Sequence, residues 1–295
     1  MSDSITRRTL IRSGVGVAAS AVAAPFLNMG RYRLFAASTQ EYTSRCVDLV
    51  NGSLVIDMLG LMTLNGERRQ RWGVDFSGMT QADVEEFRQS GIDVFHIARG
   101  VGGATAEQAY QNVLAFVGSF NSIIANRPDV FVRIDSVEDL LAVHGSGLAG
   151  ILIGLQNSTH FRSPADVETF HGLGQRVSQL TYNARNMIGN GSTERVDGGI
   201  SDFGVAIVEE MNRVGMVVDV SHSGDQTTMD ACDVSRAPVL YTHSNARALN
   251  PGHPRCKTDE AILRMAQTGG VMGITGVRMF VSSQEPTTVE HFLDH

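Results

Sequence analysis

The chain has 295 residues, of which 42% are hydrophobic and 19% are charged, a composition that fits one large globular domain able to bury a core without disulfides. The formal net charge is −7, and residues 1–38 hold five Arg and one Asp, so the remaining chain carries −11. An acidic protein of this kind is a poor partner for nucleic acid, and we expect none to bind.

Residues 1–38 have the layout of an export signal. Residues 6–12 read TRRTLIR, and a mild apolar run rich in Ala and Val follows from Gly14 to Leu27. A basic segment, a short apolar segment and small residues before a cleavage point are typical of secretory signals, and paired Arg7 and Arg8 resemble the twin-arginine type. The apolar run is too short to favour a spanning helix, and no later segment reaches 18 apolar residues. We therefore predict an exported protein, periplasmic or otherwise extracytoplasmic, with no stable membrane span after signal removal.

Short β-branched runs alternate with amphipathic stretches from residue 39 onward. This alternation predicts βαβ units and a parallel sheet, and near-continuous apolar strands indicate a sheet covered on both faces. The predicted strands are Ser53–Asp57, Ile92–Ile97, Val130–Ile134, Gly150–Gln156, Val177–Tyr182, Met216–His222, Pro238–His243 and Gly270–Thr275. The predicted helices are Gln81–Ser90, Ala106–Asn126, Asp166–Leu173, Asp202–Val214, Gln226–Ser235 and Thr258–Thr268, with Thr80, Ser201 and the start of Lys257–Glu260 as plausible caps.

Both a closed (β/α)8 barrel of the TIM type and a doubly wound open sheet are compatible with this alternation. No GxGxxG motif follows the first predicted strand, which weakens the dinucleotide-binding version of the open sheet. We predict that residues 39–295 form a single α/β barrel domain.

Polar side chains stand where the predicted strands end, and in a parallel barrel the chemistry lies at those ends. His222 and His243 each end an apolar strand and are 21 residues apart, which is one βαβ step. Their imidazoles are therefore expected to lie together in the mouth of the barrel, which is the opening at the carboxyl ends of its strands. Neutral imidazole is the commonest metal ligand, and two from neighbouring strands can chelate one ion. A single strand-end histidine such as His96 is more often a hydrogen-bonded structural residue.

The polar loop after His243 leaves the same rim, where loops usually hold substrate. Arg255 in this loop suits a substrate carboxylate, because a guanidinium can bind both oxygens at once. A surface salt bridge is the alternative for Arg255.

The sequence around the histidine pair resembles the membrane dipeptidases, a metallopeptidase family of the renal dipeptidase type. The resemblance rests on DVSHS at 219–223, on THSNARA at 242–248 with HPR at 253–255, and on QLTYN at 179–183, and it extends over about residues 50–295. It implies a (β/α)8 barrel of the metallo-dependent hydrolase kind, two zinc ions bridged by a carboxylate and a hydroxide, and cleavage of dipeptides, some β-lactams and dipeptide conjugates. By position it assigns His222 and His243 to the second metal and Arg255 to the substrate carboxylate. Family members are commonly dimers, which leaves a homodimer open.

Several positions depart from the family pattern. Leu59 and Leu61 stand where the first strand should supply a His-x-Asp pair to the first metal, and leucine cannot coordinate zinc. The bridging Glu is replaced by Gln156, whose carbonyl oxygen is a weak third ligand, and an expected His is replaced by Tyr182, a weaker acid that can still donate a hydrogen bond. The two leucines should turn a wet cation site into a packed one. We therefore expect at most one bound zinc ion, or none.

The family pattern also bears on the number of strands. The chain reaches His295 in a helix that the family follows with a final strand, so Val130–Ile134 counts as an extra strand and the eighth barrel strand is expected to be missing from these residues. An open barrel would leave unpaired edges beside Ser53–Asp57 and Gly270–Thr275.

Two functions follow from these observations. The first is a metal-dependent, dipeptidase-like hydrolase of dipeptides or related small amides that has lost its first metal site. In it His222 and His243 bind metal, Arg255 and Asn183 bind substrate, and Gln156 and Tyr182 are the catalytic candidates. The second is a non-catalytic barrel that binds small peptide or carboxylate ligands and needs no metal. An oxidoreductase on an open sheet would lack its phosphate loop.

Overall fold

The structure is a computed structural model, and it describes residues 31–32, 41–63 and 65–295. The predicted signal segment lies outside the described residues except for Arg31 and Tyr32. The chain divides into two compact units, one of residues 1–55 with 81–92 and the other of residues 56–80 with 93–295. Among the described residues, no helix is both long and apolar enough to cross a membrane.

The first unit contains a short antiparallel ribbon and two helices. Gly91, which follows the second helix, has a φ of +71°, and a Cβ atom at this position would lie 2.4 Å from Cγ1 of Val50. Glycine is therefore required here both for its backbone conformation and for the close approach of the first helix. The elements of this unit are β1 (Arg31–Tyr32), β2 (Tyr42–Thr43), α3 (Ser44–Asn51) and α5 (Gln81–Gln89).

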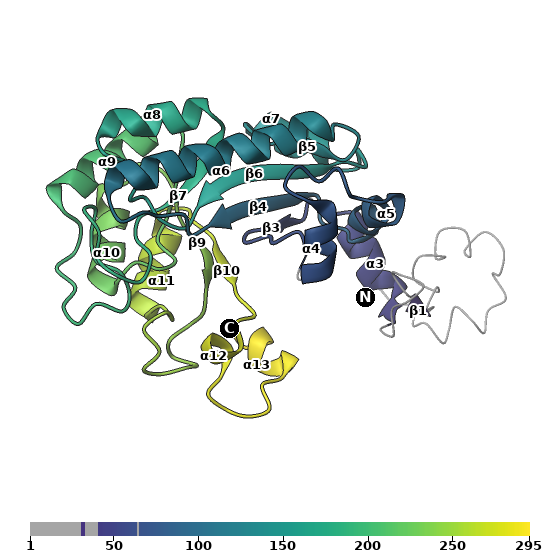
Figure 1. Cartoon of the computed structure of the whole chain (residues 1–295). Coiled ribbons are helices and arrows are strands. Elements are labelled where there is room, and N and C mark those ends of the chain that lie inside the picture. The colour runs from purple at the N-terminus through teal and green to yellow at the C-terminus, as the bar shows by residue number, and fades with distance from the viewer. Residues whose placement is uncertain (1–30, 33–40, 64) are drawn as a thin grey trace, which may run out of the picture. The chain divides into compact units, whose positions relative to one another are not determined.

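The second unit is an α/β fold built on a parallel sheet. Its strands lie in the order β3–β4–β6–β7–β8–β9–β10, and all neighbours along this path are parallel. The bounds are β3 (Ile56–Asp57), β4 (Val94–Arg99), β5 (Phe131–Arg133), β6 (Ala149–Leu155), β7 (Gln175–Gln179), β8 (Val217–Asp219), β9 (Val239–Ser244) and β10 (Met272–Ile274). Figure 1 shows helices running along one side of this curved sheet.

The helices α4 and α6–α11 of the second unit lie between successive strands, and α12 and α13 follow the last strand. Their bounds are α4 (Gly66–Trp72), α6 (Ala106–Asn126), α7 (Val137–Val143), α8 (Pro164–Gly172), α9 (Asp202–Val214), α10 (Asp225–Val234), α11 (Asp259–Gln267), α12 (Arg278–Val281) and α13 (Val289–Leu293). Ser201 and Thr258 cap α9 and α11 as the sequence predicted, and each hydroxyl accepts a backbone N–H from the first turn. Four short helices were not predicted from the sequence: α3, α4, α7 and α12.

The sheet of the second unit is a half-barrel. Within the described residues β3 and β10 are its two edges, and no pairing closes them into a ring. The predicted α/β class with a parallel, barrel-type sheet is confirmed, and its edges lie at the two segments that the sequence indicated. The segment predicted as an extra strand is β5, which lies off the main path and pairs only with β6.

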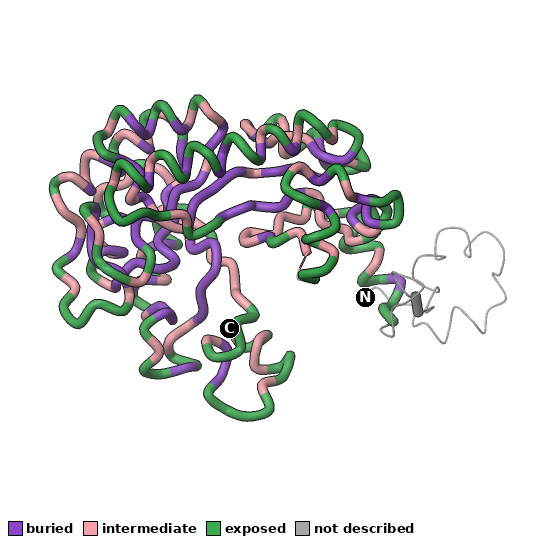
Figure 2. Tube along the Cα trace, in the orientation of Figure 1, coloured by how far each residue is buried: buried purple, intermediate pink, exposed green. Residues whose placement is uncertain are grey.

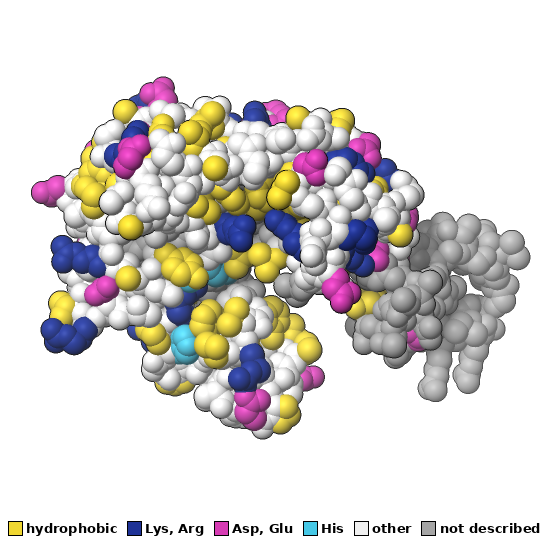
Figure 3. All heavy atoms as spheres, viewed as in Figure 1, with side chains coloured by type: hydrophobic (Ala, Val, Ile, Leu, Met, Phe, Trp, Pro, Cys, Tyr) yellow, Lys and Arg dark blue, Asp and Glu magenta, His cyan; other side chains and the backbone are white. Residues whose placement is uncertain are grey.

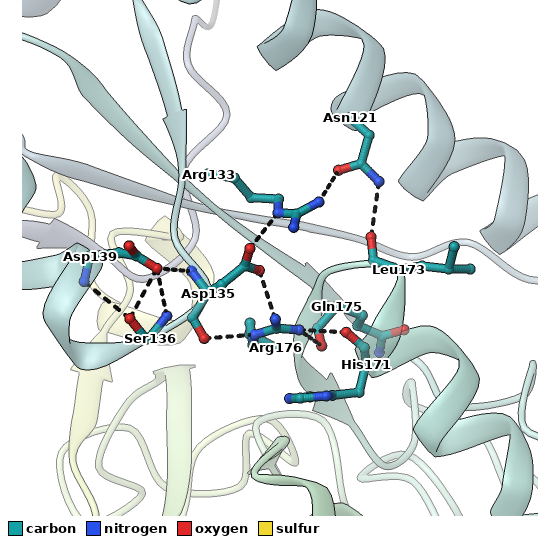
Figure 4. A network of polar contacts seen from close by, with 9 residues as sticks. All are labelled: Asn121, Arg133, Asp135, Ser136, Asp139, His171, Leu173, Gln175 and Arg176. Atoms are coloured by element: carbon teal, nitrogen blue, oxygen red, sulfur yellow. Dashed lines mark hydrogen bonds and ion pairs between the residues drawn. The ribbon is translucent and has the colours of Figure 1, made fainter.

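Strands β5 and β7 share one edge of β6. Arg133 of β5 pairs with Ile151, and β7 takes over the same edge from Ile153 onward. Polar side chains join the two strands at this exchange (Figure 4): Arg176 forms an ion pair with Asp135 at 2.8 Å, and Arg133 donates to Asp135 at 2.6 Å. Arg133 also donates to Asn121 on α6 at 3.2 Å. We refer to Asn121, Arg133, Asp135 and Arg176 as the strand joint.

Buried residues follow the central strands, as Figure 2 shows. The apolar side chains of β6, Ile151, Ile153 and Leu155, are completely buried. At the carboxyl ends of β8 and β9 the buried residues become polar, and they include Asp219 and His243. Because burying a polar group is costly unless it is bonded, this change marks the end of the sheet at which a site is expected.

Candidate functional site

Adjacent parallel strands bring the two predicted histidines together. His222 follows β8 and His243 lies in β9, and their Nε2 atoms are 2.9 Å apart. The ring centroids are 4.9 Å apart, the ring planes meet at 60°, and both side chains are buried. The structure thus places both imidazoles in one mouth, while their role as metal ligands stays a prediction.

The outer nitrogen of each imidazole faces an oxygen atom. Nδ1 of His222 lies 2.7 Å from Oδ1 of Asn183, and Nδ1 of His243 lies 2.8 Å from Oγ1 of Thr242. The Thr242 hydroxyl donates to Asp219 at 2.7 Å, because a carboxylate only accepts, so its oxygen accepts from His243. Each Nδ1 therefore carries the proton of its neutral ring, and the Nε2 lone pairs of His222 and His243 face each other.

Electrostatics keep both imidazoles uncharged. Burial, and then the charge of Arg255, hold the pKa of His222 far below its ordinary value. Burial likewise lowers the pKa of His243, although the charge of Asp219 opposes the shift. Neutral imidazole is the form that binds metal, so both rings are available as ligands without losing a proton.

The residues present fit one zinc ion with two protein ligands. Zinc binds imidazole nitrogen at about 2.0–2.1 Å, so one ion can reach two Nε2 atoms at this separation, and its positive charge would remove the repulsion between their lone pairs. Zinc-bound histidines usually donate the other ring N–H to an oxygen, as the two Nδ1 atoms do here. The part of the chain that the structure describes has no cluster of three or more His, Cys, Asp or Glu suited to a metal.

Tyr182 and Asn183 form one wall of the mouth. The Tyr182 ring stacks on the His222 ring with centroids 4.2 Å apart and planes 20° apart, and 41% of the residue stays exposed. Asn183 has a φ of 56°, a left-handed conformation that Asn tolerates better than most residues, and this turn aims its amide at His222. The structure supports Asn183 as an orienting partner of His222; its predicted contact with substrate and the catalytic role of Tyr182 stay predictions.

Asp219 organises the carboxyl ends of β8 and β9. Its carboxylate accepts from the backbone N–H and hydroxyl of Ser221 at 2.8 and 2.5 Å, and from the backbone N–H and hydroxyl of Thr242 at 3.3 and 2.7 Å. The residue is buried. The sequence analysis did not single out Asp219, although a carboxylate inside the apolar run at 217–220 was a visible signal.

Arg255 is buried beneath the histidine pair. Its Nη1 donates to the carbonyl of Ser221, and its Nη2 donates to the carbonyl of His243 at 3.4 Å. Burial lowers its pKa to about 10, so the side chain keeps its charge near neutral pH. Among the described residues its Nε is buried and has no hydrogen-bond partner. Its predicted role in holding a substrate carboxylate stays a prediction.

Lys257 is the only lysine of the chain, and it lies completely buried under the same loop. Its Nζ donates to the carbonyls of Val220 and Ser223 at 2.9 and 2.7 Å, on either side of His222. Burial lowers its pKa to about 7. No role at the site was predicted for Lys257 from the sequence.

Gln156 lies apart from the histidine pair. Its side-chain Nε2 donates to the carbonyl of Ala98 at 3.0 Å, and its backbone carbonyl accepts from the Gln179 side chain. No hydrogen bond among the described residues joins Gln156 to His222 or His243. The structure therefore gives no contact for the predicted third ligand, and its role stays a prediction.

The expectation that leucines pack the first-metal position is wrong for Leu61. This side chain is 56% exposed, and Leu59 is only partly buried. The turn that carries both residues is held by the Asp57 carboxylate, which accepts the N–H of Leu59 at 3.0 Å, so it projects Leu61 outward. His96 is a structural neighbour of this turn: it lies in β4 and contacts the Met58 carbonyl at 2.6 Å, in agreement with its predicted structural role.

The fold and the histidine pair define the class, a parallel α/β barrel-type protein with two buried histidines at its strand ends. The chain belongs to the membrane dipeptidase family, peptidase family M19, whose family model matches residues 44–295. The family named from the sequence is confirmed.

Among curated relatives, the dipeptidase tcpJ of Claviceps purpurea is 29% identical over 227 residues, which cover 69% of this chain and 53% of that protein. The dipeptidase verJ of Clonostachys rogersoniana is 34% identical over 156 residues, covering 52% and 40%. The chain thus spans about half, or less, of the length of these relatives.

Solved structures agree with this assignment. An amidohydrolase from Pseudomonas aeruginosa has a TM-score of 0.71 and 31% identity, covering 84% of this chain and 70% of that one. A metallo peptidase from Rhodobacter sphaeroides, solved with a phosphinate mimic of the dipeptide L-Ala-D-Ala, has a TM-score of 0.70, with coverage of 82% and 80%. Its identity of 20% supports the shared fold alone.

Proposed function

We propose that the chain is a divergent dipeptidase-like hydrolase that binds one zinc ion through His222 and His243 and acts on dipeptides or related small amides. The observation that carries the proposal is the convergence of the two Nε2 lone pairs, 2.9 Å apart, with both Nδ1 atoms already bonded to oxygen. The dipeptidase relatives supply the substrate class.

The chain's own residues would hold the reactants in place. A bound zinc ion supplies Lewis acidity toward a substrate carbonyl. Asn183 and Thr242 fix the two imidazoles, and Asp219 fixes Thr242. Tyr182 covers one face of His222 and limits the approach of solvent from that side. The charged guanidinium of Arg255 would attract a substrate carboxylate.

Metal content tests the proposal directly. The full chain is loaded with zinc, dialysed and measured by inductively coupled plasma mass spectrometry. We expect one zinc per chain, lost in His222→Ala and in His243→Ala, and hydrolysis of a dipeptide panel that a chelator abolishes. His144→Ala is the matched control, because His144 is partly exposed and contacts Asp93 instead of the pair. A chain without zinc or hydrolysis, or one that holds two zinc ions, contradicts the proposal.

A second candidate function is a non-catalytic barrel that binds small peptides or carboxylates. It is favoured by the absence of a third His, Cys, Asp or Glu ligand beside the pair within the described residues. Ligand binding that persists in the presence of a chelator would support this function, whereas loss of binding on chelation would exclude it.

We further propose that the protein is exported through its first 38 residues. The support is the basic segment with Arg7 and Arg8 followed by a short apolar run. Cell fractionation of the full chain, with an Arg7→Lys/Arg8→Lys double variant beside it, tests this: the natural chain is expected outside the cytoplasm and the variant inside. Equal cytoplasmic retention of both chains would contradict it.

A further inference from the structure

A cavity of about 230 Å³ lies beside the turn that carries Leu61. The turn after β3, the end of β4, helix α4 and helix α6 all contribute to its wall. The wall combines apolar and cationic groups. The apolar side chains include Leu61, Met62, Ile97, Phe116 and Phe120, and the cations are Arg69 and Arg99.

The two arginines have no counter-charge. Within the part of the chain that the structure describes, neither guanidinium forms a salt bridge or a hydrogen bond, whereas Arg162 and Arg176 both pair with carboxylates. Partial burial of the guanidinium, and then the charge of Arg99, lower the pKa of Arg69, so the two cations are close enough to interact. The Phe76 ring, 5.2 Å from Cζ of Arg69, helps to hold that side chain in position.

Two unpaired guanidiniums on one cavity favour an anion and disfavour a metal cation. Like charges held together repel each other, and an oxyanion between them converts this repulsion into charge-assisted hydrogen bonds. Figure 3 shows basic side chains near the end of β4 and over α4, with hydrophobic side chains around them. Leu61, at a position that the sequence analysis assigned to a lost metal ligand, therefore borders a cavity of positive charge.

We propose that Arg69 and Arg99 form a subsite for the carboxylate of a ligand with an apolar body. The two guanidiniums would bind the carboxylate, and Ile97, Phe116 and Phe120 would contact the apolar part. A small inorganic anion would leave the apolar wall uncovered, which favours an organic carboxylate.

The cavity lies next to the mouth of the half-barrel. Gly100 follows Arg99, and a Cβ atom at Gly100 would lie 3.6 Å from the Tyr182 ring, which in turn stacks on His222. One ligand could therefore extend from the arginines toward the histidine pair. The subsite itself needs neither zinc nor hydrolysis, so it stands or falls separately from the proposed function.

Calorimetric titration of the full chain with 4-phenylbutyrate, in a buffer that contains a chelator, tests the subsite. 4-Phenylbutyramide lacks the charge of this probe, and inorganic phosphate lacks its apolar body. We expect saturable binding of 4-phenylbutyrate, with at least tenfold weaker binding of the other two compounds. Arg69→Gln and Arg99→Gln should each weaken 4-phenylbutyrate about tenfold or more. Arg68→Gln is the matched control, because Arg68 lies on the same helix but does not line the cavity.

Other outcomes overturn the proposal. Equal binding of the acid and the amide, or unchanged affinity in both Gln variants, would show that the arginines do not hold the carboxylate. Tighter binding of phosphate would replace the organic ligand with an inorganic anion, and no binding of any probe would remove the subsite. Arg69→Lys and Arg99→Lys keep the charge and should retain part of the affinity; if a Gln variant unfolds, loss of binding in both folded Lys variants would also overturn it. Loss of 4-phenylbutyrate binding in His222→Ala would move the carboxylate to the histidine pair.

Discussion

The strand joint and the mouth use charged side chains in opposite ways. In the joint, Arg133 and Arg176 both contact the carboxylate of Asp135, and their remaining donors go to nearby amide or carbonyl oxygens (Figure 4). In the mouth, Arg255 and Lys257 are buried but donate only to backbone carbonyls. In the joint the two arginines share a carboxylate partner, whereas in the mouth Arg255 and Lys257 donate to no carboxylate.

This difference separates polar groups that stabilise the fold from polar groups held for a ligand. A buried charge is costly unless it is paired, so a site that leaves one unpaired lowers stability unless something binds there. The mouth also keeps two Nε2 lone pairs and the Nε–H of Arg255 without a suitable partner among the described residues. The joint can be explained by folding alone, and the mouth cannot.

The largest effect is predicted for substitution of Asp219, whose carboxylate links Ser221 and Thr242 at the carboxyl ends of β8 and β9. Asp219→Ala removes the acceptor of four hydrogen bonds from Ser221 and Thr242, all of them buried. We expect the free energy of unfolding, measured by urea denaturation, to fall by about 3 kcal/mol or more. Zinc affinity should fall as well, because Thr242 no longer orients His243.

Asp233→Ala is the control for this change. Asp233 pairs with Arg264 on the surface, and an exposed ion pair contributes only about 0–1 kcal/mol. If Asp219→Ala and Asp233→Ala lost the same stability, Asp219 would contribute no more to the fold than a carboxylate in a surface ion pair. Asp219→Asn should fall between them, because its amide still offers one acceptor oxygen.

Most of the fold could be predicted because it depends on local patterns. The long helix Ala106–Asn126 and the helix Asp202–Val214 were predicted with the bounds that the structure shows, since each combines a capping residue with apolar residues at helical spacing. Strand bounds were less accurate. The predicted strand Met216–His222 is reduced to Val217–Asp219, because the Asp219 carboxylate binds the Ser221 N–H and turns the chain out of the ladder.

The site was predicted only in part, because contacts between distant segments leave no periodic pattern. His222 and His243 were found from their equivalent places on successive strands. Lys257 was not assigned to the site, because its carbonyl partners are set by a loop that folds back under β8. The pairing of Arg69 with Arg99 around one cavity was equally invisible, since these residues come from a helix and a strand that only the fold brings together.

A smaller loss of stability is expected for substitution of Arg176 in the strand joint. Arg176→Met keeps most of the apolar stem but removes the ion pair with Asp135 and donors to the carbonyls of Asp135 and His171 at 2.9 and 2.6 Å. We expect a loss of about 2 kcal/mol in the free energy of unfolding. Zinc content and 4-phenylbutyrate affinity of the folded protein should not change. A change in zinc content or in 4-phenylbutyrate affinity would show that the strand joint and the mouth are coupled.

The smallest effect is a change in how stability depends on pH, and it tests whether Lys257 is buried without a counter-charge. Burial lowers its pKa from 10.5 to about 7, and a neutral amine has two N–H groups for the two carbonyls that it contacts. Between these pH values the unfolded chain binds a proton that the folded chain does not, so raising the pH favours the folded state. We expect the free energy of unfolding to rise by about 1 kcal/mol from pH 7 to pH 8, and Lys257→Met to lack this rise. Measurements in the presence of a chelator keep metal binding out of the comparison. Parallel pH profiles of the natural chain and the variant would contradict this prediction. They would mean that Lys257 stays charged in the folded protein, as the arginines of the strand joint do.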